Sequence, residues 1–345
     1  MRRYLLRLLA LVFVLSVGLP LVASAQEYPD LTGEELIVYV VFHEREGERL
    51  LARFAEHTGV SYSLLRMPTG EAVARVMAEA DSPRADVILG GVGDAHEHLA
   101  LEGLLEPHIS PEAEAIPEQY RGNLDGYWTG MYLGPLAILV NLDRWEAEFE
   151  PEDLEKPTSF FDLLDPAYQG EIIMPDPLSS GTAYTMVAAM AQLIGEDEAF
   201  DFFQELDQNV GLFTRSGFTP AQRAGIGEFL LAINFLHDQL LVAQAGFNIE
   251  SIVPEDAGWE IGGVSIIAGG PNTEAARAFK DFALSREAGQ LHTDLTQRIS
   301  TRPDVVLPEG VVPLEELPIF LEYDLVRAAE EREALLDRWE REVAR

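Results

Sequence analysis

Short apolar runs alternate with stretches of helical spacing through the first part of the chain. The apolar runs are rich in β-branched residues and cover residues 36–42, 61–65 and 85–91. Between them, Leu50, Leu51 and Phe54 follow helical spacing, and a second helical stretch opens at Thr69. Alternating strands and helices predict a parallel sheet whose ligand-binding loops lie at the carboxyl ends of the strands.

A second group of elements continues this pattern. Further strands are expected at residues 171–174, 211–213 and 227–235, and a long amphipathic helical region is expected to end at Leu206. Residues 143–156 are acidic and are interpreted as a loop, whereas residues 160–164 predict a short helix. The tail from Leu314 predicts a charged amphipathic helix.

Two apolar runs, residues 136–141 and 258–267, are expected to cross between two lobes. A mature chain of about 320 residues exceeds the usual size of a single core, so two lobes are expected. The predicted division is residues 26–136 plus 260–310 for lobe 1, residues 137–259 for lobe 2, and residues 311–345 for a C-terminal helical segment.

The first 25 residues have the pattern of a secretory signal peptide. Arg2, Arg3 and Arg7 precede an apolar run, and Ala23-Ser24-Ala25 provides the small residues of a cleavage site, so we expect cleavage after Ala25. No later stretch of the sequence is long and apolar enough to span a bilayer. The chain has no cysteine, and therefore no lipidation site, disulfide or thiolate metal site. These features predict a free periplasmic protein.

The chain is strongly acidic. Its formal net charge is −35, and Lys156 and Lys280 are its only lysines. Such a surface repels nucleic acid and anionic membranes, and we interpret the acidic excess as a solvated surface. Because the overall field opposes an anionic ligand, local dipoles and hydrogen-bond donors would have to hold it.

The turn Ser179-Ser180-Gly181-Thr182 lies between a β-type run with two prolines and a helical pattern. A strand-to-helix turn of this kind directs backbone N–H groups, the positive end of the helix dipole and several hydroxyls to one point. The turn is therefore a candidate anion site. The alternative is that Ser180 or Thr182 only caps the helix.

Six ordered strings resemble the solute-binding proteins of ATP-binding-cassette importers, in the cluster of ferric-ion-binding and hexose-phosphate-binding proteins. The strings are TGEAVARVMAE (69–79), ADVILGGVGDAH (85–96), GYWTGMYLGPLAILVN (126–141), FFDLLDPAYQGEIIMPDPLSSGTAYT (160–185), FLHD (235–238) and GWEIGGVSII (258–267). The resemblance implies an α/β, type II periplasmic binding protein. In that fold each lobe is a mostly parallel sheet flanked by helices, and crossing strands let the lobes close around one ligand.

Within this cluster, the sequence is more similar to the hexose-phosphate branch. Iron binders of the cluster are recognised by two adjacent tyrosines whose phenolates hold the metal, and no two tyrosines are adjacent in this chain. A hard cation such as Fe(III) prefers anionic oxygen ligands, and the corresponding segment here, residues 234–238, reads NFLHD. The hexose-phosphate binders resemble this chain at Ser180-Gly181-Thr182, at His237-Asp238 and at Glu260.

The resemblance and the chemistry of the residues suggest two halves of one site. Ser179, Ser180, Thr182 and the N–H groups around Gly181 would bind phosphoryl oxygens, with Arg215 or Ser216 as a further donor. The side chains expected to bind sugar hydroxyls are those of His237, Asp238 and Glu260. Loops of the first lobe would complete the cleft, with Thr69, Gly91 and Asp94.

Other kinds of protein fit the sequence less well. A metal site at His43-Glu44 and His96-Glu97-His98 matches no standard zinc signature. A hydrolase built on Ser179 or Ser180 with His237 and Asp238 lacks a Gly-x-Ser-x-Gly elbow, and adjacent His and Asp residues align poorly for a triad.

The sequence therefore predicts a monomeric periplasmic protein, not an enzyme and without a cofactor. It would capture a small phosphorylated solute, with a sugar phosphate as the first choice, and deliver it to an inner-membrane permease and its ATPase. A ferric iron or iron-chelate carrier and a ligand sensor for a membrane receptor remain as alternatives.

Overall fold

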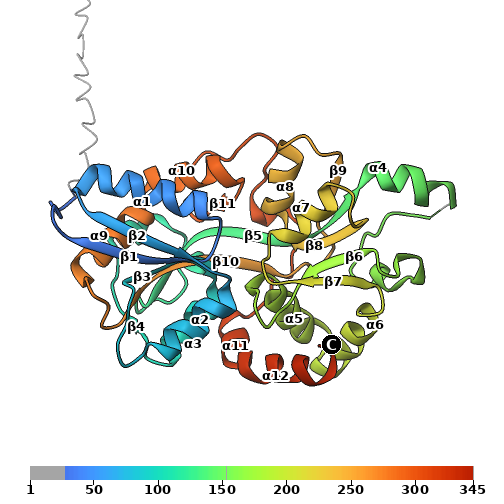
Figure 1. Ribbon diagram of the computed structural model, residues 1–345, viewed down its shortest axis with the longest axis horizontal. Coiled ribbons are helices and arrows are strands. Elements are labelled where there is room, and N and C mark those ends of the chain that lie inside the picture. The colour runs from blue at the N-terminus through green and yellow to red at the C-terminus, as the bar shows by residue number, and fades with distance from the viewer. Residues whose placement is uncertain (1–27, 153, 345) are drawn as a thin grey trace, which may run out of the picture.

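The computed structural model of the chain describes residues 28–152 and 154–344. The expected signal peptide and its cleavage point lie outside the described residues. Helices cover both faces of one long twisted sheet (Figure 1). Along the main path of this 11-stranded sheet the strand order is β2-β1-β3-β10-β5-β8-β6-β7.

The first lobe is built on parallel strands. β1 (Glu35–Val40) pairs in parallel with β2 (Ser61–Arg66) and with β3 (Val87–Val92). A short strand, β4 (Leu105–Glu106), pairs with β10. The helices of this lobe are α1 (Glu44–Thr58), α2 (Thr69–Ala78), α3 (Gly93–Leu101), α9 (Thr273–Ala283) and α10 (Arg286–Thr296).

Two long strands join the lobes. β5 (Trp128–Asn141) is buried along its whole length, as its apolar residues require. It pairs antiparallel with β10 (Trp259–Ile267) as far as Pro135, and with β8 from Leu136 onward. A short strand, β11 (Ile299–Ser300), also pairs with β5. The expected fold class, with crossing strands between two α/β lobes, is confirmed, while the exact lobe boundaries stay predictions.

The second lobe repeats the parallel arrangement. β6 (Ile172–Pro175) pairs in parallel with β7 (Val210–Thr214) and with β8 (Leu231–Phe235), and β9 (Ile249–Ile252) pairs with β5. The helices of this lobe are α4 (Leu142–Arg144), α5 (Gly181–Ile194), α6 (Glu196–Leu206), α7 (Thr219–Gly225) and α8 (Leu236–Gln244).

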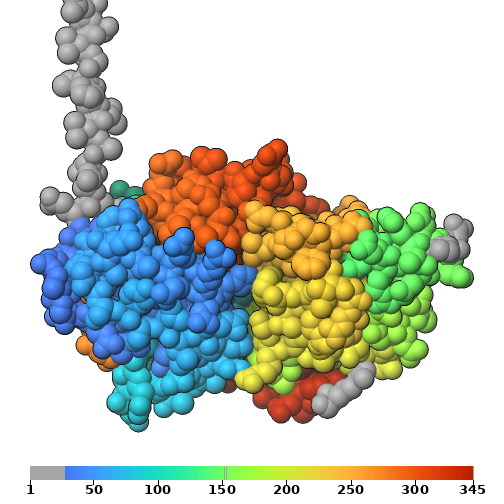
Figure 2. Space-filling view, turned by 45° about the horizontal axis from the view of Figure 1, so that its top comes forward, coloured from blue at the N-terminus to red at the C-terminus, as the bar shows by residue number. Residues whose placement is uncertain are grey.

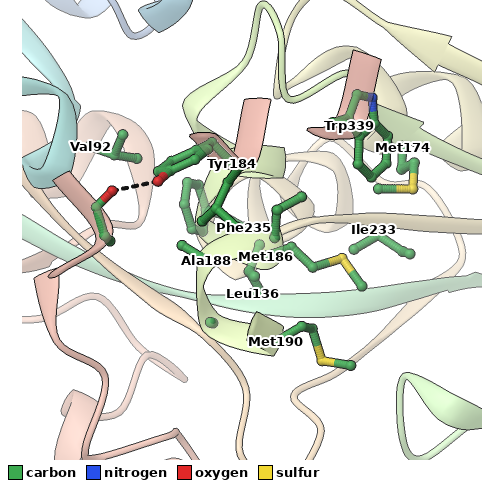
Figure 3. Packing of buried hydrophobic residues seen from close by; sticks show 14 of the residues in the cluster. Val92, Leu136, Met174, Tyr184, Met186, Ala188, Met190, Ile233, Phe235 and Trp339 are labelled. Carbon is green, nitrogen blue, oxygen red and sulfur yellow. Dashed lines mark hydrogen bonds between the residues drawn. The ribbon is translucent and has the colours of Figure 1, made fainter. Parts of the chain in front are cut away.

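Helix α5 lies at the centre of the largest core cluster. Its residues are buried from Gly181 to Ala191, because its sequence is apolar on all faces and every face is covered. Figure 3 shows Met186 and Met190 of this helix close to Leu136, Ile233 and Phe235 of the sheet.

The C-terminal segment forms two short helices, α11 (Leu325–Glu330) and α12 (Arg332–Glu342). Helix α11 contacts α3 of the first lobe and α5 of the second, and α12 contacts α5 and α6, so this segment lies under both lobes (Figure 1). The Tyr184 hydroxyl of α5 donates a hydrogen bond to the Ala328 carbonyl (Figure 3).

Two expectations about the second lobe need correction. Residues 143–156 are not simply a loop: α4 continues into a π-helical turn, Trp145–Phe149, and a 3-10 turn, Glu150–Glu152. The rings of Trp145 and Phe149 stack at 5.6 Å, an aromatic contact that the acidic composition does not reveal. The amphipathic region up to Leu206 is two helices, because Gly195 adopts a φ of 97° and ends α5.

Further 3-10 turns connect the larger elements, at Pro111–Ala115, Glu118–Tyr120, Phe161–Leu164, Pro166–Tyr168 and Leu314–Glu316. Within the described part of the chain, no helix combines the length and apolar character needed to cross a bilayer.

Candidate functional site

A cleft with about 460 Å³ of empty space, including its opening to solvent, lies where the two lobes meet. Figure 2 shows the first lobe, in blue, and the second lobe, in yellow, touching along one seam. The Gly70 N–H at the start of α2 donates a hydrogen bond of 2.9 Å to the Ser179 carbonyl before α5. The lobes are therefore closed on each other.

Seven of the twelve candidate residues line this cleft. They are Thr69, Gly91, Ser180, Thr182, His237, Asp238 and Glu260. Thr69 follows β2, Ser180 and Thr182 follow β6, and His237 and Asp238 follow β8, beyond the carboxyl ends of these strands, where the alternating pattern predicts ligand loops. Gly91 lies within β3, and Glu260 lies near the start of the crossing strand β10.

The other candidates have different surroundings. Gly181 is the first residue of α5 and packs so closely that an added Cβ would lie 2.7 Å from Thr69 Oγ1. The Ser216 hydroxyl accepts a hydrogen bond of 3.3 Å from Arg66. The Ser179 hydroxyl lies 3.1 Å from the Arg215 carbonyl oxygen and does not line the cleft.

Two charged candidates are occupied by ion pairs. The Asp94 carboxylate lies 2.5 Å from the Arg332 guanidinium, and both side chains are 3% exposed. The Arg215 side chain is 78% exposed and is paired with Glu71. Neither residue lines the cleft.

Ser180, Thr182 and Thr69 form a group that we call the hydroxyl cluster. All three are buried, and a Cβ added to Gly217 would lie 2.3 Å from Thr182 Oγ1 and 3.4 Å from Ser180 Oγ. Ser180 is the N-cap residue of α5, yet its side chain makes no capping hydrogen bond. Its hydroxyl therefore does not serve the helix, and the capping alternative for Ser180 is wrong.

Six helices begin at this cleft, and none of them has a side-chain cap. The N-cap residues of α1, α2, α3, α5, α7 and α8 all line the cleft and accept no capping hydrogen bond; they are His43, Pro68, Val92, Ser180, Phe218 and Phe235. Away from the cleft, α4, α9, α10 and α11 each have a capping side chain, from Asn141, Asn272, Ser285 and Asp324, whereas α6 and α12 have none. The first-turn N–H groups at the cleft therefore have no capping side chain as a partner, although the Gly70 N–H of α2 bonds with the Ser179 carbonyl, and the helix dipoles favour an anion there.

A second group, which we call the charged cluster, consists of His43, His237, Asp238, Glu260 and Arg298. His43 Nε2 lies 3.1 Å from Asp238 Oδ1, although the two atoms are not aligned as a hydrogen bond. His237 Nε2 lies 3.6 Å from Asp238 Oδ1 and 3.8 Å from Glu260 Oε1. All members except His43 are less than 5% exposed.

Arg298 is the cation of the charged cluster. Its guanidinium pairs with the buried Glu46 and lies over the ring of Tyr132, 4.5 Å from the ring centroid. Burial alone would lower the pKa of Arg298, but Glu46 and the other acids raise it above the usual value, so the side chain stays charged.

The pKa values of the two acids in the charged cluster are shifted in opposite directions. Burial raises the pKa of Glu260 well above its usual value, in spite of the attraction of Arg298. Burial also opposes ionisation of Asp238, but His237, His43 and Arg298 outweigh it and lower the pKa of Asp238 to about 2. Burial, followed by repulsion from Arg298, lowers the pKa of His237 well below its usual value, and the attraction of Asp238 opposes this shift.

Several polar atoms of the charged cluster are buried without a hydrogen-bond partner. Within the described residues these include His43 Nε2, His237 Nδ1, Asp238 Oδ1 and Arg298 Nε. A buried polar atom without a partner is costly. Their concentration at one end of the cleft leaves hydrogen-bonding capacity there unused.

His43, Arg66 and Arg298 line the cleft but are absent from the candidates named above. His43 and Arg66 stand at the carboxyl ends of β1 and β2, so the same strand-end pattern could have identified them. Arg298 follows α10 in a turn where Gln297 has a φ of 61°, and no local sequence pattern marks it.

No cluster of three or more His, Cys, Asp or Glu side chains in residues 28–152 and 154–344 has the arrangement of a metal site. His96 bonds with the Ser265 hydroxyl at 2.9 Å and with the Gly90 carbonyl at 3.0 Å, so both of its ring nitrogens have structural partners.

Residues 82–310 match the model of the bacterial extracellular solute-binding protein family, and the chain belongs to this family. The structure of the periplasmic binding protein AfuA from Actinobacillus pleuropneumoniae, with exogenous fructose 6-phosphate bound, is 34% identical. It covers 90% of this chain and 99% of that one, with a TM-score of 0.86.

Two further relatives are more distant. The probable ABC transporter periplasmic-binding protein y4fP of Sinorhizobium fredii is 26% identical, over 70% of this chain and 68% of that protein. Iron-bound HitA from Pseudomonas aeruginosa is 21% identical with a TM-score of 0.76, covers 88% of this chain and 98% of that one, and shares the fold.

Fold, family and relatives define the class: the chain is a periplasmic solute-binding protein of an ABC transporter, and such proteins deliver their ligand to a membrane permease and its ATPase. The resemblance to the hexose-phosphate branch is confirmed, since the identity to AfuA is 34% and that to iron-bound HitA is 21%.

Proposed function

We propose that this protein captures a sugar phosphate in the periplasm. The observation that carries the proposal is the pairing of two unlike groups in one closed cleft. The hydroxyl cluster shares the cleft with six helix N-termini without side-chain caps, and the charged cluster offers buried polar atoms without partners.

The hydroxyl cluster suits the phosphoryl group. Ser180 and Thr182 can donate from their hydroxyls, and α5 and α2 both begin at this part of the cleft. Hydrogen bonds to a charged acceptor are among the stronger ones. Helix N-termini bind phosphate without a buried lysine, and both lysines of this chain lie outside the lining of the cleft.

The charged cluster suits the hydroxyls of the sugar. Asp238 is an acceptor, the lowered pKa of His237 disfavours a charged imidazole, and the raised pKa of Glu260 favours a protonated carboxyl that can donate a hydrogen bond. Arg298 is already balanced by Glu46. With Asp238 ionised, this end of the cleft carries no net positive charge, so it fits a neutral polyol better than a second anion.

The remaining parts of the proposal concern export and partners. The protein would reach the periplasm through a signal peptide cleaved after Ala25, without a lipid anchor, and act there as a monomer. It would carry out no covalent step, because its role is to close around a ligand and release it to the permease.

A thermal-shift panel on the mature protein, unfolded and refolded to remove carried-over ligand, tests this proposal. The panel holds glucose 6-phosphate, fructose 6-phosphate, glucose, inorganic phosphate, 2-aminoethylphosphonate and ferric citrate. We expect a rise in melting temperature with a hexose phosphate, and none with glucose or inorganic phosphate, because only a ligand that binds the folded state stabilises it.

Other outcomes of the panel would replace the proposal. A rise with ferric citrate alone would make the protein an iron carrier, and a rise with 2-aminoethylphosphonate alone would mean that the charged cluster binds an ammonium group rather than hydroxyls.

A further inference from the structure

Arg66 is the last residue of β2 and lines the cleft half-buried, next to the hydroxyl cluster. Its Nε donates a hydrogen bond of 3.1 Å to the Phe42 carbonyl, and its Nη2 donates one of 3.3 Å to the Ser216 hydroxyl of the opposite lobe. Both acceptors are neutral, so these contacts fix the guanidinium without neutralising it.

Arg66 differs in this respect from the other arginines near the cleft. Arg298 is paired with Glu46, and Arg215 is paired with Glu71. Within the described residues, no carboxylate lies within 4.0 Å of the Arg66 guanidinium. This is notable in a chain of net charge −35, where acids far outnumber bases.

The acids that influence Arg66 through space are Glu71, Asp238 and Glu44. Glu71 is held by Arg215, and Asp238 lies against His43 and His237. Glu44 is exposed in the first turn of α1. Burial outweighs their attraction and lowers the pKa of Arg66, in keeping with a cation that has lost water without gaining a counter-ion.

Arg66 lies beside the hydroxyl cluster rather than beside the charged cluster. Thr69, the first residue of α2, follows it three positions later. Its partner Ser216 precedes Gly217, against which Thr182 and Ser180 pack. A tetrahedral anion bound by the hydroxyl cluster would therefore lie beside a planar fork of donors that matches its oxygens.

We propose that Arg66 detects the second negative charge of the bound group, so that the cleft selects dianionic phosphate monoesters over monoanions of the same shape. This inference rests on the proposed function. The hydroxyls and helix N–H groups are neutral donors that serve either kind of anion. A cation without a counter-ion, partly withdrawn from water, gains most from the ligand with the greater charge.

The test compares glucose 6-phosphate with glucose 6-sulfate by isothermal titration at about pH 8, where a phosphate monoester carries about two charges and the sulfate ester one. We expect the wild-type protein to bind the phosphate at least about tenfold more tightly than the sulfate. In Arg66→Gln this ratio should fall to within about threefold, mainly through weaker phosphate binding.

Two further variants test whether the charge of Arg66 causes the preference for phosphate. Arg66→Lys keeps the charge and should retain most of the preference even if the glutamine variant folds poorly. Arg215→Gln is the matched control, because it removes an exposed arginine of the same rim that already has a carboxylate partner, and it should leave the ratio unchanged.

Two results would overturn the inference while leaving the proposed function intact. One is an unchanged ratio of phosphate to sulfate affinity in Arg66→Gln. The other is an equal loss of affinity for both ligands in Arg66→Lys and Arg66→Gln. Absence of binding of any hexose phosphate to the wild-type protein would instead refute the proposed function, and this inference with it.

Discussion

The hydroxyl cluster and the charged cluster share one cleft but differ in how their polar groups are prepared for a ligand. In the hydroxyl cluster, Thr69, Ser180 and Thr182 are neutral side chains beside uncapped helix N-termini. In the charged cluster, Asp238 and Glu260 are buried acids whose pKa values are shifted in opposite directions. The first group depends on backbone geometry and the second on the balance of buried charges.

This difference suggests why a very acidic protein can bind an anion. Backbone N–H groups cannot lose their donor protons in the physiological range, so the hydroxyl cluster keeps its donors whatever the surrounding charge. The charged cluster is sensitive to any change in ionisation, because each buried charge is balanced by a specific partner. Perturbing each cluster should therefore have different consequences.

The largest effect is expected at Arg298. Arg298→Met removes the buried partner of Glu46 and should lower the free energy of unfolding by about 3 to 5 kcal/mol, as breaking a buried ion pair does. Urea unfolding measures this loss, and the double variant Arg298→Met with Glu46→Gln should recover part of it. If Arg298→Met is as stable as the wild-type protein, the charged cluster does not depend on balanced charge.

A smaller effect, confined to binding, is expected in the hydroxyl cluster. Ser180→Ala and Thr182→Val should each weaken phosphate-ester binding by about 1 to 3 kcal/mol, because a buried ligand oxygen loses its partner. The control is Ser179→Ala, whose hydroxyl is directed to the Arg215 carbonyl outside the cleft. Isothermal titration showing equal affinities in all three variants would remove the hydroxyl cluster from the site.

The acids of the charged cluster should shape the pH dependence of stability in opposite ways. Asp238 has its pKa lowered from 3.8 to about 2, so its contribution is present above 3.8 and is lost as the pH falls toward 2. The wild-type protein loses free energy of unfolding as the pH falls through this range. The Asp238→Asn variant should lose about 2 kcal/mol less, since one pKa unit corresponds to about 1.4 kcal/mol.

Glu260 has a raised pKa, so its contribution is present below its usual value of 4.5 and is lost as the pH rises through the folded-state pKa. Glu260→Gln resembles the protonated acid and should remove this loss. Unfolding curves measured from acid to alkaline pH test both variants, and a Glu260→Gln curve parallel to that of the wild-type protein would contradict the account.

The smallest effect is expected at the exposed rim. Arg215→Met should change the free energy of unfolding by less than about 1 kcal/mol, the usual worth of a surface ion pair. Sugar-phosphate affinity should not change, because Arg215 does not line the cleft. A clear loss of affinity would show that Arg215 turns toward the ligand, as its sequence position had suggested.

The sequence predicted the parts of the fold that depend on local patterns. Alternating apolar runs located β1 and β3, the strand-to-helix turn marked Ser180 and Thr182, and the family resemblance marked His237 and Asp238, and all four residues line one cleft. These are local signals, since the hydrophobic period defines a strand and its carboxyl end defines the loop that reaches the ligand.

Pairings between distant residues could not be predicted in this way. Asp94 looked like a cleft residue, but its carboxylate pairs with Arg332, 238 positions further along the chain. Arg298 enters the charged cluster from the turn after α10, where its role depends on Glu46 of α1. Such contacts arise from the packing of whole elements, and the spacing of residues along the chain contains no record of them.

The most direct test of the central claim is a crystal structure of the refolded protein with glucose 6-phosphate. The account predicts that the phosphoryl oxygens lie within hydrogen-bond distance of Ser180, Thr182 and the first N–H groups of α5, with the sugar hydroxyls at Asp238 and Glu260. A phosphoryl group bound at Arg298, with the sugar directed toward Ser180, would reverse the two ends of the cleft and contradict the account.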